Sequence, residues 1–224
     1  MHNPIYDITP FTALDFPDHL TTIFWFAGCN MRCSYCYNKN IVFGKGKIAE
    51  AKALEFLKTR VGLLEGVVLS GGECTLYPEI LVFCQKIKEL GFKIKIDTNG
   101  LEFTKIKHLI DNHLVDYIAL DYKAPKYKFL DIAKSDRFED FSKTLDYIIL
   151  SNINYEVRTT VHIDILDEND INAIIKDLAQ RGYNQKYYLQ EFVYSDDTIG
   201  RLQMASRKLN KELLNSDIEI VVRK

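Results

Sequence analysis

Short β-branched and aromatic runs alternate with longer stretches of helical spacing along almost the whole of this 224-residue chain. Such alternation indicates repeated strand–helix units around a parallel sheet, because parallel strands need a crossover connection that is usually a helix. Six units are too few to close the usual eight-stranded barrel. We therefore expect an α/β fold, a partial (β/α)6 barrel with a parallel sheet. The predicted strands are Leu20–Phe26, Gly66–Ser70, Phe92–Asp97, Tyr117–Asp121, Tyr155–Val161 and Lys186–Phe192.

Segments with helical spacing connect the strands, and two further elements are expected near the end of the chain. The predicted helices are Ala49–Arg60, Pro78–Leu90, Thr104–Asn112, Arg137–Leu150, Glu168–Arg181 and Leu202–Leu214, and Ile218–Val222 is expected to be a short edge strand. The sequence has no fixed-period repeat and no Pro- or Ser-rich linker. We therefore expect a single domain over residues 1–224, with a lead-in at 1–19, a barrel core at 20–192 and the last helix and strand at 193–224.

The charge balance argues against several classes of partner. Lys and Arg number 29 and Asp and Glu number 31, so the net charge of −2 gives no general attraction for nucleic acids or anionic membranes. No apolar run approaches the roughly 20 residues of a membrane span, and the first residues lack the order of a signal peptide. We expect a cytoplasmic protein without nucleic-acid or membrane partners.

Three of the five cysteines, Cys29, Cys33 and Cys36, fall within eight positions after the first predicted strand. This C-x3-C-x2-C spacing favours metal ligation over a secreted disulfide framework. Three close thiolates can hold an iron–sulfur cluster and leave one iron open to a chelating small molecule. A zinc site would need a fourth ligand, for which His19, ten residues upstream, is the nearest candidate. Zinc and a non-enzymatic metal-binding module are the alternatives.

Polar motifs follow the next three strands at the end where a barrel of this kind carries its chemistry. The turn Ser70–Glu73 has two glycines that let the backbone approach a ligand closely, and a carboxylate that can accept hydrogen bonds from an ammonium group. The motifs Asp97–Gly100 and Asp121–Lys123 end the third and fourth strands. Each alone is typical of an ordinary turn. Together they predict a shared pocket beside the cysteines.

The cysteine segment GCNMRCSYCYNKN resembles the signature of the radical S-adenosylmethionine (SAM) enzymes, with Tyr35 as its aromatic residue. Within that superfamily it looks like the version found in activating enzymes of glycyl radical enzymes. The lead-in ITPFTALDFPDHLTTIFWFAGC is similar to the second type of anaerobic ribonucleoside-triphosphate reductase activating protein. The resemblance runs from about Ile8 to Phe192, and its most specific part is the cysteine loop.

The resemblance implies a reaction. The three cysteines would bind a [4Fe–4S] cluster whose fourth iron is chelated by SAM, and an electron from the cluster would cleave SAM to methionine and a 5′-deoxyadenosyl radical. In activating enzymes this radical acts on a glycine of a glycyl radical enzyme. No second C-x2-C-x2-C run is present, so flavodoxin or ferredoxin is the expected electron donor. The nearest alternative keeps the chemistry but takes a small-molecule substrate, as in 7-carboxy-7-deazaguanine synthase.

The resemblance also implies a set of SAM-binding residues. They are Tyr35, Gly71, Gly72, Glu73, Asp97, Thr98, Asp121, Lys123, Arg158 and Gln190. Glu73 would contact the amino group of SAM, and a monovalent cation is implied near Asp97, Thr98 and Asp121. Arg158 needs an anionic partner inside the barrel, which is either the SAM carboxylate or, as structural support, Glu73 or Asp121.

The two cysteines outside the loop, Cys74 and Cys84, are expected to be buried. Cys74 follows Glu73, where relatives often carry Pro or Thr, and it is expected to be a small buried residue, with a redox-sensitive thiol as the alternative. Cys84 falls on the apolar stripe of the predicted helix Pro78–Leu90. Cys84 is therefore expected in the core.

Overall fold

The computed structural model describes residues 3–223, so Met1, His2 and Lys224, the outermost residues of the expected domain, lie outside the described residues. The described chain forms one eight-stranded sheet in which the strands follow one another in chain order. The strands are β1 Ile5–Thr12, β2 Thr21–Phe26, β3 Gly66–Gly71, β4 Lys93–Thr98, β5 Tyr117–Asp121, β6 Asn154–Val161, β7 Tyr187–Glu191 and β8 Ile220–Arg223.

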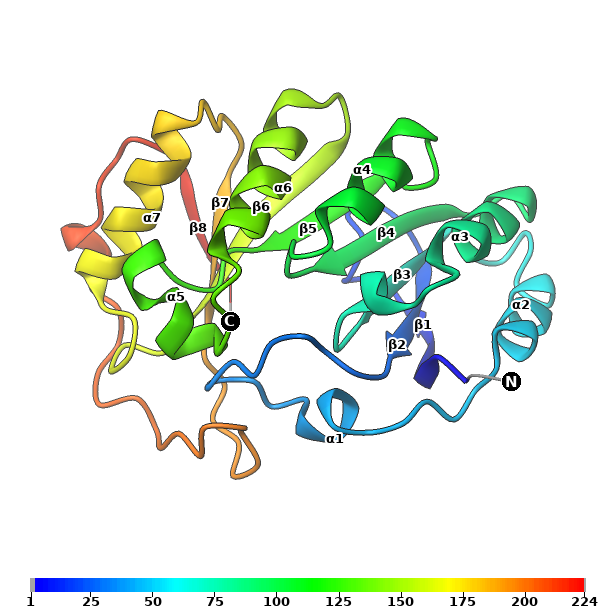
Figure 1. The fold of residues 1–224 in the computed structure, drawn as a ribbon, viewed down its shortest axis with the longest axis horizontal. Coiled ribbons are helices and arrows are strands. Elements are labelled where there is room, and N and C mark those ends of the chain that lie inside the picture. Colours follow the sequence, from blue (N-terminus) through cyan, green and yellow to red (C-terminus); the bar gives the residue numbers. More distant parts are fainter. Residues whose placement is uncertain (1–2, 224) are drawn as a thin grey trace.

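Strands β2 to β8 are parallel to their neighbours, and β1 is antiparallel to β2. Each new strand is added beside the previous one, so the carboxyl ends of β2 to β7 meet at one edge of the sheet. Within residues 3–223, β1 and β8 do not pair, and the barrel stays open between them. Helices form an outer arc around the curved sheet (Figure 1). The prediction of a partial barrel with a parallel sheet is confirmed.

Five of the predicted helices are present with ends shifted by at most two residues. They are α2 Glu50–Lys58, α3 Ile80–Glu89, α4 Phe103–Asp111, α6 Phe138–Leu150 and α7 Glu168–Gln180. The start of α7 shows why the sequence begins a helix there. The Asp167 side chain accepts hydrogen bonds from the backbone N–H groups of Asn169 and Asp170, while the Asp170 carboxylate accepts one from the backbone of Asp167.

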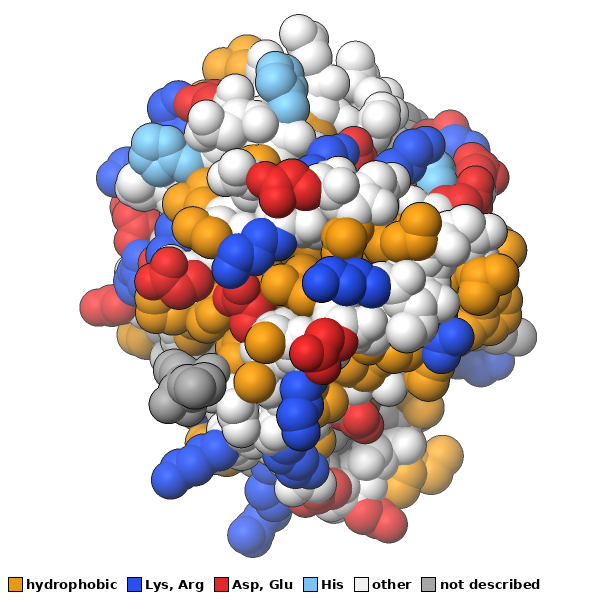
Figure 2. Space-filling model, turned by 90° about the vertical axis from the view of Figure 1, so that its right-hand side faces the viewer, with side chains coloured by type: hydrophobic (Ala, Val, Ile, Leu, Met, Phe, Trp, Pro, Cys, Tyr) orange, Lys and Arg blue, Asp and Glu red, His pale blue; other side chains and the backbone are white. Residues whose placement is uncertain are grey.

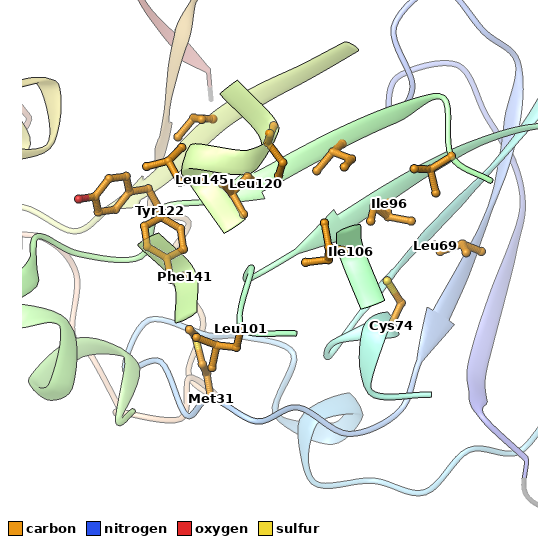
Figure 3. Close-up of a cluster of buried hydrophobic side chains, with 14 of the residues drawn as sticks. Met31, Leu69, Cys74, Ile96, Leu101, Ile106, Leu120, Tyr122, Phe141 and Leu145 are labelled. Carbon is orange, nitrogen blue, oxygen red and sulfur yellow. The ribbon is translucent and has the colours of Figure 1, made fainter. Parts of the chain in front are cut away.

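The main core lies between the outer face of the sheet and the helices. Figure 3 shows part of it, with strand residues Leu69, Ile96 and Leu120 and helix residues Ile106, Phe141 and Leu145 in one buried cluster. Cys74 and Cys84 belong to the same cluster and are fully buried. The expectation that both are buried, Cys84 as a core residue, is confirmed.

Within residues 3–223, one strand and two α-helices were not predicted, nor was a short 3₁₀ helix at Cys74–Leu76. Strand β1 contains Pro10, is mostly half-exposed and pairs with β2 through an irregular register, so its side-chain pattern is weak. Helix α1, Lys39–Val42, has four residues, and helix α5, Lys126–Ala133, has eight. Both are too short for a clear helical period.

The predicted helix Leu202–Leu214 is wrong: only a 3₁₀ turn at Lys211–Leu213 forms there. Several backbone groups of this segment bond to side chains in α7 or in the loop before it, and its own backbone bonds are confined to the 3₁₀ turn. The Gln203 carbonyl lies 2.9 Å from Nε2 of His162, and the Asn210 N–H donates to Glu168. Tertiary contacts thus override helical spacing here. The edge strand predicted at Ile218–Val222 is present as β8.

Acidic and basic side chains are interspersed with apolar ones over the face of the molecule shown in Figure 2. In the part of the chain that the structure describes, no helix is both long enough and apolar enough to cross a membrane.

Candidate active site

A cavity of about 230 Å³ lies at the carboxyl ends of the strands. It brings together residues that lie far apart in the sequence. Its wall includes the predicted residues Cys29, Cys33, Tyr35, Cys36, Gly71, Gly72, Asp97, Thr98, Asp121, Lys123, Arg158 and Gln190. Glu73 is not on this wall; it is 1% exposed and lies behind it.

The cysteine loop is held by backbone hydrogen bonds to two elements that the sequence did not predict. The N–H groups of Arg32 and Ser34 donate to carbonyls at the end of α5, over 2.9 and 3.1 Å. From the segment after β7, the N–H groups of Ile199 and Gly200 donate to the carbonyls of Cys36 and Ser34.

The side chain of Met31 anchors the same loop in the core. It is 1% exposed and belongs to the buried cluster that contains Leu101 (Figure 3). The position of the three thiols is therefore set by backbone contacts on two sides and by packing beneath.

The three thiols fit an iron–sulfur cluster as a donor set, because all three lie on one cavity wall and come from one loop. Burial, and then the Glu73 carboxylate, raises the pKa of Cys29 to about 11, and burial raises the pKa of Cys33 to about 12. Both thiols are protonated at neutral pH in the metal-free chain. Binding a cluster would therefore release protons.

His19, the fourth ligand considered for zinc, does not lie near the cysteines. Its Nε2 is 2.6 Å from Nζ of Lys93, the first residue of β4, so His19 sits at the amino ends of the strands. The zinc hypothesis was wrong about this ligand. Among residues 3–223, no three His, Cys, Asp or Glu side chains surround a single metal-ion position.

The two glycines of the Ser70–Glu73 turn are required by contact with the protein's own backbone. A Cβ on Gly72 would lie 1.9 Å from the carbonyl oxygen of Gly28. Gly71 has φ +114°, and a Cβ there would lie 2.5 Å from the backbone nitrogen of Phe26. The turn therefore packs directly against the start of the cysteine loop.

Glu73 ties this turn to the motif that ends β4. Its carboxylate accepts hydrogen bonds from the N–H and hydroxyl of Thr75, at 3.1 and 2.5 Å. It also accepts one from the Thr98 hydroxyl at 2.9 Å and one from the Asn99 N–H at 2.7 Å. Burial raises the pKa of Glu73, and these hydrogen bonds oppose the rise. The contact of Glu73 with the amino group of SAM stays a prediction.

Five charged side chains form one cluster, and four of them line the cavity. Asp97 pairs with Lys95 over 2.5 Å and with Arg158 over 3.3 Å. Asp121 pairs with Arg158 over 2.6 Å and with Lys123 over 2.9 Å. Arg158 therefore supports the two aspartates and does not pair with Glu73. Its contact with the SAM carboxylate stays a prediction.

The electrostatics of this cluster keep both aspartates ionised. Burial alone would raise the pKa of Asp97, but Arg158 and Lys95 outweigh it and hold that pKa well below its usual range. The pKa of Asp121 is lowered in the same way, by Arg158 and Lys123 against the effect of burial. Both carboxylates are anions at neutral pH.

Asn99 and Lys95 are among the residues of the site that sequence reasoning missed. Asn99 donates from Nδ2 to Sγ of Cys29 at 3.8 Å and to Oδ1 of Asn30 at 2.8 Å, although only Asp97 and Thr98 of its motif were predicted as site residues. Lys95 is 2% exposed inside the barrel. Strand alternation could have found Lys95, because it lies two residues before Asp97 and so shares its face.

The sequence pattern of the Radical SAM superfamily matches residues 23–178, a stretch that includes the cysteine loop and every predicted site residue except Gln190. The chain belongs to the radical SAM superfamily. It is therefore a radical SAM enzyme by family, and a [4Fe–4S] cluster and SAM are the cofactors that this family implies.

Relatives of this radical SAM enzyme include two from the curated proteins. A Methanocaldococcus jannaschii protein provisionally named a glycyl-radical enzyme activating enzyme is 33% identical over 199 residues, covering 84% of this chain and 80% of the relative. The pyruvate formate-lyase-activating enzyme of Clostridium pasteurianum is 32% identical over 152 residues, covering 64% of this chain and 63% of the relative.

Among solved structures, Streptococcus suis SuiB bound to S-adenosylmethionine superposes with a TM-score of 0.66 at 12% identity. The match covers 90% of this chain and 52% of SuiB, so the chain spans about half the length of that protein. At this identity the likeness shows the fold alone.

Proposed function

We propose that this radical SAM enzyme installs a glycyl radical on a partner enzyme. The observation that carries the proposal is the 33% identity to a protein provisionally named a glycyl-radical enzyme activating enzyme, which extends over 80% of that relative. The cavity that joins the three cysteines to the charged cluster supports it. Anaerobic ribonucleoside-triphosphate reductase is the proposed partner, because the lead-in before the cysteines resembles its activating protein.

The residues of the cavity have distinct proposed roles. Cys29, Cys33 and Cys36 would hold the cluster, which would supply the electron for reductive cleavage of SAM. Lys123 and Arg158 present positive charge to the carboxylate of SAM. The remaining wall residues, Tyr35 and Gln190 among them, position SAM and exclude water from the site.

The electron is proposed to come from outside this chain. Three of its five cysteines form the loop, and the other two, Cys74 and Cys84, are fully buried in the core. We propose flavodoxin or ferredoxin as the donor. The cytoplasm is the proposed compartment, because thiols are kept reduced there.

Electron paramagnetic resonance tests the proposed function. The anaerobically reconstituted enzyme is mixed with SAM, dithionite and anaerobic ribonucleoside-triphosphate reductase. A doublet from one coupled α-hydrogen, with release of 5′-deoxyadenosine, is the expected result. The Cys33→Ala protein is the control and should give neither signal, because it lacks a ligand of the cluster.

Two other outcomes would replace the proposal. Consumption of a purine-like small molecule with 5′-deoxyadenosine release, and no glycyl radical, would favour a function like that of 7-carboxy-7-deazaguanine synthase. One tightly bound zinc per chain without iron-dependent absorbance would favour a metal-binding module.

A further inference from the structure

All four carboxylate oxygens of Asp97 and Asp121 are engaged by side chains of this protein. In Asp97, Oδ1 accepts from Nζ of Lys95 at 2.5 Å, and Oδ2 accepts from Oγ of Ser70 at 2.9 Å and pairs with Arg158 at 3.3 Å. In Asp121, Oδ1 accepts from Nε of Arg158 at 2.6 Å and Oδ2 from Nζ of Lys123 at 2.9 Å. Three cationic side chains thus surround two anionic ones.

This arrangement does not fit the monovalent metal ion that the family resemblance implies beside Asp97, Thr98 and Asp121. A metal ion would need oxygens that already accept from donors, and it would lie among three cationic side chains that the two aspartates already pair with. The Thr98 hydroxyl is also engaged, because it donates to Glu73 and accepts from the Gly100 N–H.

Lys95 is the group that a metal ion would disturb most. It is 2% exposed, and the one hydrogen bond that its side chain makes among the described residues goes to Asp97. A metal ion that took this carboxylate oxygen would leave a buried ammonium group without a partner, which is costly. Strand β4 delivers Lys95 two residues below Asp97 on the inner face of the barrel, so the ammonium group approaches the aspartate from beneath the cavity.

We propose that Lys95 is a built-in counter-ion that takes the place of a monovalent metal ion in this site. Lys95 is then a positioning residue: it holds Asp97, and Asp97 and Asp121 together hold Arg158 at the cavity. SAM binding by this enzyme consequently needs neither K⁺ nor Na⁺. The inference rests on the proposed SAM site and is independent of which partner protein or small molecule is the substrate.

The experiment compares SAM binding by reconstituted protein in KCl, NaCl and tetramethylammonium chloride at equal ionic strength. Wild type should bind SAM with the same affinity in all three salts. Lys95→Met should bind about tenfold more weakly in tetramethylammonium chloride, the usual size of a lost charge-assisted contact, and should regain affinity in KCl or NaCl. Lys93→Met is the matched control on the same strand, because Lys93 is exposed, and it should behave as wild type.

The melting temperature of the cluster-free proteins in the same salts gives a second measurement that needs no cofactor. K⁺ or Na⁺ should raise it for Lys95→Met relative to tetramethylammonium, and should leave wild type unchanged. If Lys95 had only a structural role, the Lys95→Met substitution would lower the melting temperature equally in every salt.

Two results would overturn the proposal. One is wild-type SAM affinity that rises about tenfold in KCl or NaCl over tetramethylammonium chloride. The other is a Lys95→Met protein whose affinity and melting temperature do not respond to the salt. If wild type bound no SAM in any salt, the cofactor assignment would fail, and the melting temperatures would still decide the role of Lys95.

Discussion

Gly72 lies so close to Gly28 that a methyl group on it would stand 1.9 Å from the Gly28 carbonyl oxygen. In a Gly72→Ala protein the turn or the cysteine loop must move, and we expect a loss of about 1–3 kcal/mol in unfolding free energy together with most of the bound iron. Urea denaturation and iron analysis measure the two effects. Gly62→Ala is the control for iron content only: its φ of +78° makes an alanine costly in stability, but a Cβ there meets nothing within 4 Å, and the protein should keep its iron. Normal iron content in Gly72→Ala would contradict the prediction.

Arg158 is the shared partner of two buried aspartates, so its removal should destabilise the protein in a pH-dependent way. Folding lowers the pKa values of Asp97 and Asp121 below the value of about 4 that an aspartate has in the unfolded chain. The two carboxylates therefore stabilise the fold above a pH of about 4. This stabilisation is lost as the pH falls through their pKa values in the folded protein. At pH 7 we expect Arg158→Met to lose about 3–5 kcal/mol.

The same variant tests the direction of this pH dependence. Without Arg158 the folded-state pKa values of both aspartates rise, so the variant takes up protons at a higher pH than wild type does. The stability gap should therefore narrow as the pH falls from 7 toward 4, as measured by urea unfolding. A gap that stays constant would refute this account. Lys126→Met removes an ion pair with Glu139 whose side chains are 70% and 68% exposed, so solvent screens it and the variant should keep nearly wild-type stability at every pH.

At the scale of elements, the cysteine loop depends on the irregular segment after β7. The Gly200 N–H donates to the Ser34 carbonyl at 2.8 Å, and a Cβ on Gly200 would lie 2.7 Å from that same oxygen. We expect Gly200→Ala to weaken this contact by about 1–3 kcal/mol and to expose the reconstituted cluster to dioxygen. Decay of the cluster absorbance in air should be faster than in wild type. Lys208→Ala, an exposed position in the same segment, should decay at the wild-type rate.

At the scale of the whole molecule, SAM should stabilise the folded protein through its cavity. At a free concentration one hundred times its Kd, a ligand that binds only the folded state adds about 2.7 kcal/mol. For a chain of this size that corresponds to a rise in Tm of roughly 5–10 °C. Calorimetry of the reconstituted protein with and without SAM measures it. Cys33→Ala should show a smaller rise, because it lacks a cluster ligand, and equal rises in the two proteins would argue against SAM binding at the cluster.

The parallel strands, five of the helices and the positions of the three cysteines follow from local sequence pattern. Each of these elements has a face that must be buried, and that need appears in the sequence as a periodic run of apolar residues. The motifs at the carboxyl ends of the strands could be assigned to one site for a similar reason, because parallel strands deliver their ends to one edge. Helix α5 is too short to show a clear period, and the segment after β7 is held by bonds from its backbone to distant parts of the chain.

The sequence by itself therefore determined the class of fold, the end of the barrel that carries the site, and the residue types present there. Only the tertiary structure decided how the charges pair. Arg158 faces Asp97 and Asp121, Glu73 lies behind the wall, and Lys95 takes an oxygen of Asp97. These pairings depend on the relative register and curvature of neighbouring strands, and no local pattern encodes the distance between side chains that different strands bring together.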